Sequence, residues 1–380
     1  MIYAYGVTLQ GTSHIKDNTV CQDAHKIIKC GKDKDMVIAA VADGIGSEEH
    51  SDVASEIAVR VSTDYCEQRI SSQQCKTDEE ILDTIKASFS AAKKAIEEEA
   101  KTRGHTSDQY GTTLSLAVFT NGALYYGHVG DSGIVALTTE GLYKKVTEQQ
   151  RNEYGNTFHL FSKEKWLFGH FDEKICSVFL ATDGMLEPLF PNLIKNEPVS
   201  IHVKLAQYFI DNRSLKIDNV GEATVQARVE DYLRNIPHKK VNDDKTVVVL
   251  VDPSVESKIQ PEAYYKEPDW TELERKFEEE WKRKAYPHLF KDENADVSEK
   301  TVPHTVMEKT TELSMNQIAW GPSDSSSRDA TPDIALMGAD KPTPEVKKEQ
   351  PIVNESEAHG EKCGFWWCIF NFFKKRRPKN

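Results

Sequence analysis

Five aspartates stand where apolar runs of the chain begin or end, and carboxylates held in this way can bind divalent cations. Asp43 closes the run in "VADG", Asp131 lies in "VGDS", and Asp183 lies in "ATDG". Asp23 ends "CQD" before "AHKIIK", and Asp243 opens "DDKT" before "TVVVLV". The end of a strand lets a polar side chain leave the core while the sheet holds it in place.

A single aspartate beside glycine is most often a turn residue, because Asp-Gly is common turn chemistry. Because five aspartates lie at the beginning or end of an apolar run, a role as turn residues alone explains them less well. Oxygen ligands at fixed positions suit Mg²⁺ and Mn²⁺, which prefer carboxylates and water. Two such ions about 3.5–4 Å apart can activate a water and hold a phosphoryl group for attack. The pattern therefore favours a site for hard divalent ions and a reaction at phosphorus.

The bulk composition excludes several function classes. A formal net charge of −13 over 380 residues argues against nucleic-acid binding, which needs a basic footprint. The seven cysteines are scattered without C-x-x-C pairs, which predicts no disulfide framework and favours a reducing compartment. The N-terminus does not resemble a signal peptide, and no apolar run approaches the roughly 18–20 residues needed to span a bilayer. We therefore expect a cytoplasmic protein.

Strand-like and helix-like segments alternate along the first two thirds of the chain. Residues 51–70 and 78–103 have the composition of long helices, and apolar runs such as "MVIAAVAD" predict strands. Asn121 and Gly122 separate two β-rich runs and predict a type I′ hairpin turn. Hairpin strands with paired helices between them indicate antiparallel sheets covered by helices. We expect an α+β fold over residues 1–252, a four-layer αββα sandwich of two packed antiparallel β-sheets flanked by pairs of helices.

The composition changes after this domain. Residues 253–290 contain a charged helix candidate with apolar residues at helical spacing, which predicts packing on the domain or on a partner. These apolar residues are Trp270, Leu273, Phe277 and Trp281. The next segment, residues 291–360, is rich in Ser, Thr, Pro, Glu and Lys, so we expect a disordered linker.

The tail, residues 361–380, combines "GFWWCIFNFF" with "KKRRPKN". Ten residues are too few to span a membrane, but aromatic and basic side chains suit the surface of an anionic membrane. One prediction is peripheral contact of residues 363–377 with the inner face of the membrane. The other is that the aromatic residues dock on the catalytic domain or on a partner. Both interpretations stay open.

Taken in order, the motifs resemble those of the PPM-type (type 2C) metal-dependent serine/threonine protein phosphatases. The segments "CQDA", "VADGIGS", "YGTTLSLAVFTNGALYYGHVGDSG", "ATDGM" and "DDKTVVVLV" occur in the family's order within residues 1–252. "GTSHIKDNTVCQDA" is most similar to the bacterial branch. The resemblance implies hydrolysis of phosphoserine and phosphothreonine in proteins by a water bridging two Mn²⁺ or Mg²⁺ ions. It also implies a phosphoprotein substrate, a role in signalling and a monomeric catalytic domain.

The resemblance assigns roles to the aspartates. Asp43 would bridge two metal ions, with the backbone carbonyl of Gly44 binding one of them. Asp183 and Asp243 would complete one site, which makes Asp43 and Asp183 the central catalytic residues. In "DDKT" the family's pattern favours Asp243 as the ligand, although the spacing leaves Asp244 as an alternative.

Two further aspartates would lie at the margin. The resemblance places Asp23 beside the cluster and Asp131 at a third, more weakly held ion. The irregular segment 148–173 would be a flap beside the site.

Two positions depart from the family's pattern. Gln22 stands where Glu is frequent, although an amide can still hold a metal-bound water. Asn18 stands in place of the phosphate-binding Arg. His14 or Lys16 could supply positive charge to the phosphate, but Lys lacks the fork of Arg and His14 is equally explained as a structural residue. The alternative function is therefore a pseudophosphatase that binds a phosphoprotein or partner without turnover. A third hypothesis makes the chain a tethered scaffold that acts through its tail.

Overall fold

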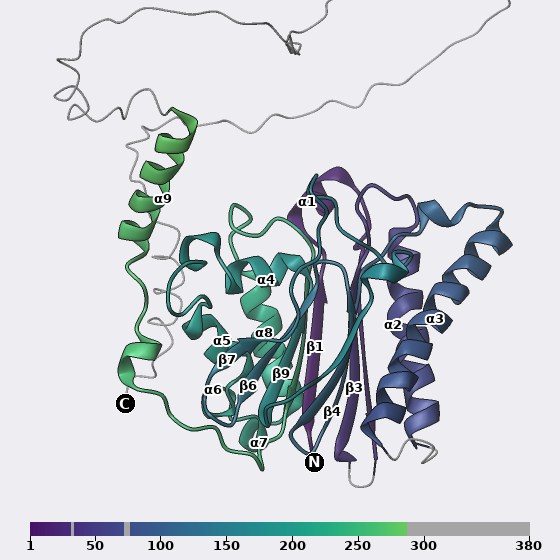
Figure 1. Ribbon diagram of the computed structural model, residues 1–380, viewed down its shortest axis with the longest axis horizontal. Helices are drawn as coiled ribbons and strands as arrows, with labels where there is room; N and C mark the ends of the chain where they lie inside the picture. The colour runs from purple at the N-terminus through teal and green to yellow at the C-terminus, as the bar shows by residue number, and fades with distance from the viewer. Residues whose placement is uncertain (32–33, 72–76, 287–380) are drawn as a thin grey trace, which may run out of the picture. The chain divides into compact units, whose positions relative to one another are not determined.

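A computed structural model describes residues 1–31, 34–71 and 77–286. One compact unit includes Met1–Trp281 and contains two five-stranded sheets whose paired strands are all antiparallel (Figure 1). The predictions about the linker at 291–360 and the tail at 361–380 lie outside the described residues.

Each sheet is formed by strands distant in the sequence. The first sheet has the order β1-β10-β9-β6-β7, that is Tyr3–Leu9, Lys245–Val251, Ile175–Ala181, Gly133–Thr138 and Tyr143–Lys145. The second has the order β2-β3-β4-β5-β8, that is Asp23–Cys30, Met36–Asp43, Leu114–Thr120, Ala123–Val129 and Leu167–Phe171.

Helices cover the outer face of each sheet. The long helices α2 (Ser51–Ser71) and α3 (Asp78–Arg103) pack on the second sheet, and α4 (Asp183–Leu189), α5 (Val203–Ile210) and α8 (Glu222–Arg234) pack on the first (Figure 1). The remaining helices are short or peripheral: α1 (Thr12–Asp17), α6 (Asn212–Leu215), α7 (Ile217–Val220) and α9 (Trp270–Ala285).

Strand β3 shows why the sandwich has four layers. Its odd-numbered residues from Val37 to Val41 belong to the core between the two sheets, whereas Ile38, Ala40 and Ala42 pack in the core under α2 and α3. Successive side chains of a strand point to opposite faces, so both faces of β3 are buried and its sequence is continuously apolar. The predicted αββα sandwich is confirmed.

The predicted hairpin turn is confirmed. Asn121 and Gly122 join β4 to β5 with φ angles of 50° and 77°, as the predicted hairpin turn requires. None of the cysteines among the described residues forms a disulfide. In the same part of the chain, no helix is long and apolar enough to cross a membrane.

Helix α9 lies within the predicted 253–290 extension. Trp270, at its first residue, is 9% exposed and packs against Ile194 and Leu193. Phe277, two turns later, is 51% exposed. The start of the apolar stripe therefore packs on the domain, which is one of the two alternatives given above.

Candidate metal centre

The predicted aspartates come together where strands of both sheets begin or end. Asp43 is the last residue of β3 and lies directly opposite Asp23, the first residue of β2. Asp183 follows β9 and opens α4, while Asp243 precedes β10. Asp131 lies in the turn from β5 to β6. Both sheets therefore contribute carboxylates to the same place.

Three of these side chains are close enough to share an ion. Asp43, Asp131 and Asp183, called the acidic centre below, each offer an oxygen within 4.8 Å of the others. Asp23 is buried behind them, where the hydroxyl of Thr182 donates to its Oδ2 at 2.8 Å. The donors are all oxygen, which is the ligand type that Mg²⁺ and Mn²⁺ prefer.

The electrostatics favour a bound cation. Burial, followed by the charges of Asp23 and Asp183, raises the pKa of Asp43 well above its ordinary value. Burial, followed by Asp131 and Asp243, raises the pKa of Asp183 to about 7. Carboxylates crowded in this way resist ionisation together unless positive charge compensates them. The residues present therefore fit a site for divalent ions.

Two threonines hold the backbone of Asp43. The backbone N–H of Asp43 donates to Thr113 Oγ1 at 2.9 Å, and the backbone N–H of Thr113 donates to the Asp43 carbonyl at 2.8 Å. Thr112 Oγ1 donates to the same carbonyl at 3.0 Å. Neither threonine is predicted as a site residue from the sequence, although both belong to the "YGTT" motif. They fix the carboxylate at the strand end.

Gly44 presents its backbone to the same place. Its N–H donates to the Gln22 carbonyl at 3.1 Å, and it lies opposite Thr112 as an isolated bridge. Among the described residues, no group donates to the Gly44 carbonyl. A Cβ at this position would lie 2.7 Å from the carbonyl oxygen of Ser51, so the close approach of α2 requires glycine. The Gly44 carbonyl thus remains available as a ligand.

The two adjacent aspartates of "DDKT" have different surroundings. Asp244 is 4% exposed, and its carboxylate accepts from the backbone N–H of Gly11 at 2.5 Å and of Gln22 at 2.7 Å. His14 Nδ1 lies 3.0 Å from Asp244 Oδ1. Asp243 is exposed, and its charge acts on the acidic centre. Asp244 is thus a structural anchor, and Asp243 is the side chain available to an ion.

The predicted phosphate-binding residues His14 and Lys16 both lie on α1. One ring nitrogen of His14 lies within 4.8 Å of carboxylate oxygens of Asp243 and Asp244, whereas Lys16 is exposed. Helix α1 ends at Asp17, and Asn18 is its C-cap with a left-handed φ of 57°. Asn18, at the position of the family's Arg, therefore ends a helix in this chain. Phosphate binding by His14 and Lys16 stays a prediction.

Arg151 is a member of the site that the sequence does not predict. Its Nη2 lies 2.9 Å from Asp131 Oδ2 and 3.0 Å from Asp183 Oδ2, and its Nε donates to Asp131 Oδ2 at 3.0 Å. The only sequence signal is a basic residue within the predicted flap, residues 148–173. The flap therefore reaches the acidic centre.

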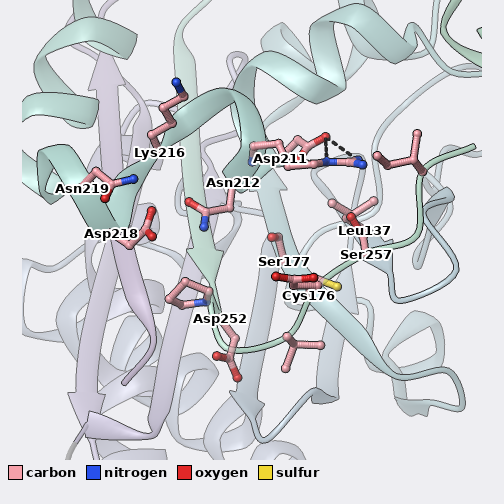
Figure 2. A pocket seen from close by; sticks show the side chains of 15 residues that line it. Leu137, Cys176, Ser177, Asp211, Asn212, Lys216, Asp218, Asn219, Asp252 and Ser257 are labelled. Carbon is pink, nitrogen blue, oxygen red and sulfur yellow. Dashed lines mark hydrogen bonds and ion pairs between the residues drawn. The ribbon is translucent and has the colours of Figure 1, made fainter.

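A pocket of about 550 Å³ lies elsewhere in the domain (Figure 2). Cys176 and Ser177, at the start of β9, and Asp252, after β10, line it. Because Asp183 follows the other end of β9, the pocket and the acidic centre lie at opposite ends of that strand. Burial is the main cause that raises the pKa of Cys176 to about 12, so the thiol is a poor nucleophile.

A comparison with protein families shows to which family the chain belongs. A sequence model described as protein phosphatase 2C matches residues 10–234, more than half of the 380-residue chain. The chain belongs to the protein phosphatase 2C family. As a member of this family it is a protein serine/threonine phosphatase. The resemblance of the motifs to the type 2C phosphatases is thus confirmed. A search of curated proteins gave no match.

Several solved structures are similar to this phosphatase. The catalytic domain of the serine/threonine phosphatase PstP, in complex with two manganese ions, is 18% identical over 66% of this chain and 97% of its own, with a TM-score of 0.44. Stp1 from Staphylococcus aureus is 13% identical over 66% and 95%, with a TM-score of 0.46. PppA from Pseudomonas aeruginosa is 16% identical over 66% and 97%, with a TM-score of 0.43.

Proposed function

We propose that this phosphatase hydrolyses phosphoserine and phosphothreonine in proteins at a centre that holds two Mn²⁺ or Mg²⁺ ions. The supporting observation is the convergence of Asp43 from one sheet and Asp183 from the other, both with a raised pKa. The folded chain holds these carboxylates close together although their charges repel. A bound divalent cation is the simplest way to compensate their negative charge.

Four groups are the proposed ligands. Asp43 would serve both ions, the Gly44 carbonyl one of them, and Asp183 with Asp243 would complete the set. When bound, the two ions would supply an activated water and positive charge for the phosphoryl oxygens. Asp23 would stay behind the ligands and hold their position through its hydrogen bond from Thr182.

The chain's own residues prepare the site before any substrate arrives. Thr112 and Thr113 fix the direction of Asp43 through its backbone. Asp244 accepts hydrogen bonds from the backbone of Gly11 and Gln22 next to the start of β10, and these bonds fix the position of its neighbour Asp243. We keep His14 and Lys16 as the proposed phosphate-binding residues because both lie on the helix that follows Gly11.

The catalytic domain proposed here covers residues 1–252. The family match ends at residue 234, but β10 (Lys245–Val251) pairs with both β1 and β9 in the first sheet. A chain ending at residue 234 would lack this interior strand and Asp243. The observed pairing therefore supports the longer boundary.

The test is hydrolysis of p-nitrophenyl phosphate and of a phosphothreonine peptide, each with EDTA, Mn²⁺ or Mg²⁺. We expect turnover only with a divalent ion, and a loss of at least about 100-fold in Asp43→Asn and Asp183→Asn. Asp218→Asn is the matched control, because Asp218 is exposed on α7 and lines the pocket at the opposite end of β9 from the acidic centre. Folded wild-type protein without metal-dependent turnover would contradict the proposal and favour a pseudophosphatase.

A further inference from the structure

One basic side chain contacts two members of the acidic centre from its solvent-exposed side. The Arg151 guanidinium contacts Asp131 Oδ2 and Asp183 Oδ2 through the same Nη2 atom, at 2.9 and 3.0 Å. Its Nε adds a second bond to Asp131 Oδ2 at 3.0 Å. A guanidinium remains charged at any working pH and binds carboxylates with a fixed donor geometry. Arg151 therefore neutralises the flank of the centre that faces the flap.

The flap backbone holds Arg151 in this position. Arg151 and Thr157 form an isolated antiparallel bridge that closes a short loop. Thr157 Oγ1 donates to Asp131 Oδ2 at 2.5 Å, so both residues of the bridge bind the same oxygen. Within the loop, Asn152 accepts from Gly155 at 2.9 Å through its carbonyl. The loop is thus fastened to Asp131 at both of its ends.

The two residues before Arg151 anchor the chain where the loop begins. Gln149 Nε2 donates to the Asp131 carbonyl at 2.8 Å, and the Gln150 N–H donates to the Gly130 carbonyl at 2.7 Å. These bonds place the start of the loop beside the carboxylates whatever the identity of residue 151. A change of Arg151 should therefore alter the charge at the site without detaching the whole flap.

Sterics and charge together exclude an ion from the same place. A Mg²⁺ ion shared by Asp131 Oδ2 and Asp183 Oδ2 must lie about 2.0–2.1 Å from each oxygen. Arg151 Nη2 lies within 3.0 Å of both oxygens, so it occupies the space between them. The charge of the guanidinium would in addition repel a cation at this distance. Arg151 uses only Oδ2 of each carboxylate, which leaves Oδ1 of Asp183 to the proposed ligand set.

We propose that Arg151 is a built-in cation that replaces a third metal ion, so that the chain binds two divalent ions and not three. The proposal rests on the proposed function, because it assumes the two-ion centre. In this role Arg151 is a positioning residue, which orients Asp131 and Asp183 and holds the loop at 151–157 beside them.

Metal stoichiometry is the direct test. Mn²⁺ titration of the full chain, followed by calorimetry and by electron paramagnetic resonance of free Mn²⁺, should give two sites in the wild type. Arg151→Gln should give three sites, and Arg151→Lys, which keeps the charge, should stay at two. The control is Arg234→Gln, because Arg234 pairs with Glu230 on the surface of α8 and should not change the count. Three sites in the wild type, or two in Arg151→Gln, would overturn the proposal.

A second readout needs no metal. In EDTA, the amides of residues 151–157 should exchange hydrogen at least about tenfold faster in Arg151→Gln than in the wild type. Unchanged exchange would show that Arg151 does not hold the loop. The outcomes separate the two proposals: three wild-type sites with metal-dependent turnover refute only the role of Arg151. Absence of Mn²⁺ binding in the wild type refutes the two-ion centre itself.

Discussion

Asp23 and Asp43 lie directly opposite each other as the first residue of β2 and the last residue of β3. Like charges in this position destabilise a pair of strands. For both residues, burial is the largest cause and neighbouring carboxylates the next cause of a pKa well above the ordinary value. Strands β2 and β3 are stabilised by their apolar residues, but the two carboxylates at their ends repel each other. A cation bound beside these carboxylates would compensate the repulsion.

Metal binding should therefore stabilise the fold. We expect Mn²⁺ at about 100 times its Kd to raise the melting temperature of the wild type by about 5–10 °C relative to EDTA. Asp43→Asn should melt higher than the wild type in EDTA, because one repelling charge is gone, and should respond little to Mn²⁺. Differential scanning calorimetry measures both. A full Mn²⁺ response in Asp43→Asn would refute its role as a ligand.

The two aspartates of "DDKT" should give opposite phenotypes. Asp244→Asn cannot accept from both Gly11 and Gln22 through oxygen, so we expect a loss of about 1–3 kcal/mol in the free energy of unfolding. Asp243→Asn should unfold like the wild type but bind Mn²⁺ at least about tenfold more weakly. Urea unfolding in EDTA and Mn²⁺ titration distinguish the two. The reverse pattern would assign the metal to Asp244.

Thr113 should affect metal binding although it is not itself a proposed ligand. Thr113→Val keeps the shape but removes the acceptor for the Asp43 N–H and the hydroxyl contact to Ser132. We expect a loss of about 1–3 kcal/mol in stability and about 10–100-fold weaker Mn²⁺ binding. Thr113→Ser retains the hydroxyl and should restore binding. Equal binding in the Val and Ser variants would show that the hydrogen bond does not position Asp43.

Acid should destabilise the domain through His128. This ring is fully buried between Ser115 Oγ and the Glu148 carbonyl, and burial lowers its pKa to about 4. The unfolded state binds a proton at higher pH than the native state does. The free energy of unfolding should therefore fall as the pH drops from about 6.5 to about 4, by about 3 kcal/mol from this group.

The measurement is urea unfolding in EDTA across that pH range. His128→Asn should flatten the fall in stability, while His238→Asn, a change at an exposed histidine, should leave it intact. An unchanged slope in His128→Asn would exclude His128 as its source.

The sequence predicts the fold well because the signals are local. Continuous apolar runs mark the strands, and Asn121–Gly122 marks a hairpin whose φ angles only such residues adopt easily. Strand β8 (Leu167–Phe171) escapes prediction because it is short, lies within the irregular flap and exposes Leu167. Its place in the second sheet comes from pairing with β5, not from its own sequence pattern.

The site is predicted less completely, for a related reason. Each aspartate lies at the beginning or end of an apolar run, so a local pattern in the sequence makes it a candidate. Arg151 reaches Asp131 and Asp183 from a loop, and nothing near it in the sequence reveals that contact. The distinct role of Asp244 depends on the backbone of Gly11 and Gln22, more than 200 residues away. Contacts of this kind exist only after the chain has folded.

The centre draws Asp43 from one sheet and Asp183 from the other, and this has a consequence for cooperativity. An ion chelated by both side chains can remain bound only while the two sheets stay stacked on their shared core. Binding energy is then lost by any partial opening, in the same way as by complete unfolding. Metal loading should thus couple the two sheets more tightly in unfolding than their shared core does by itself.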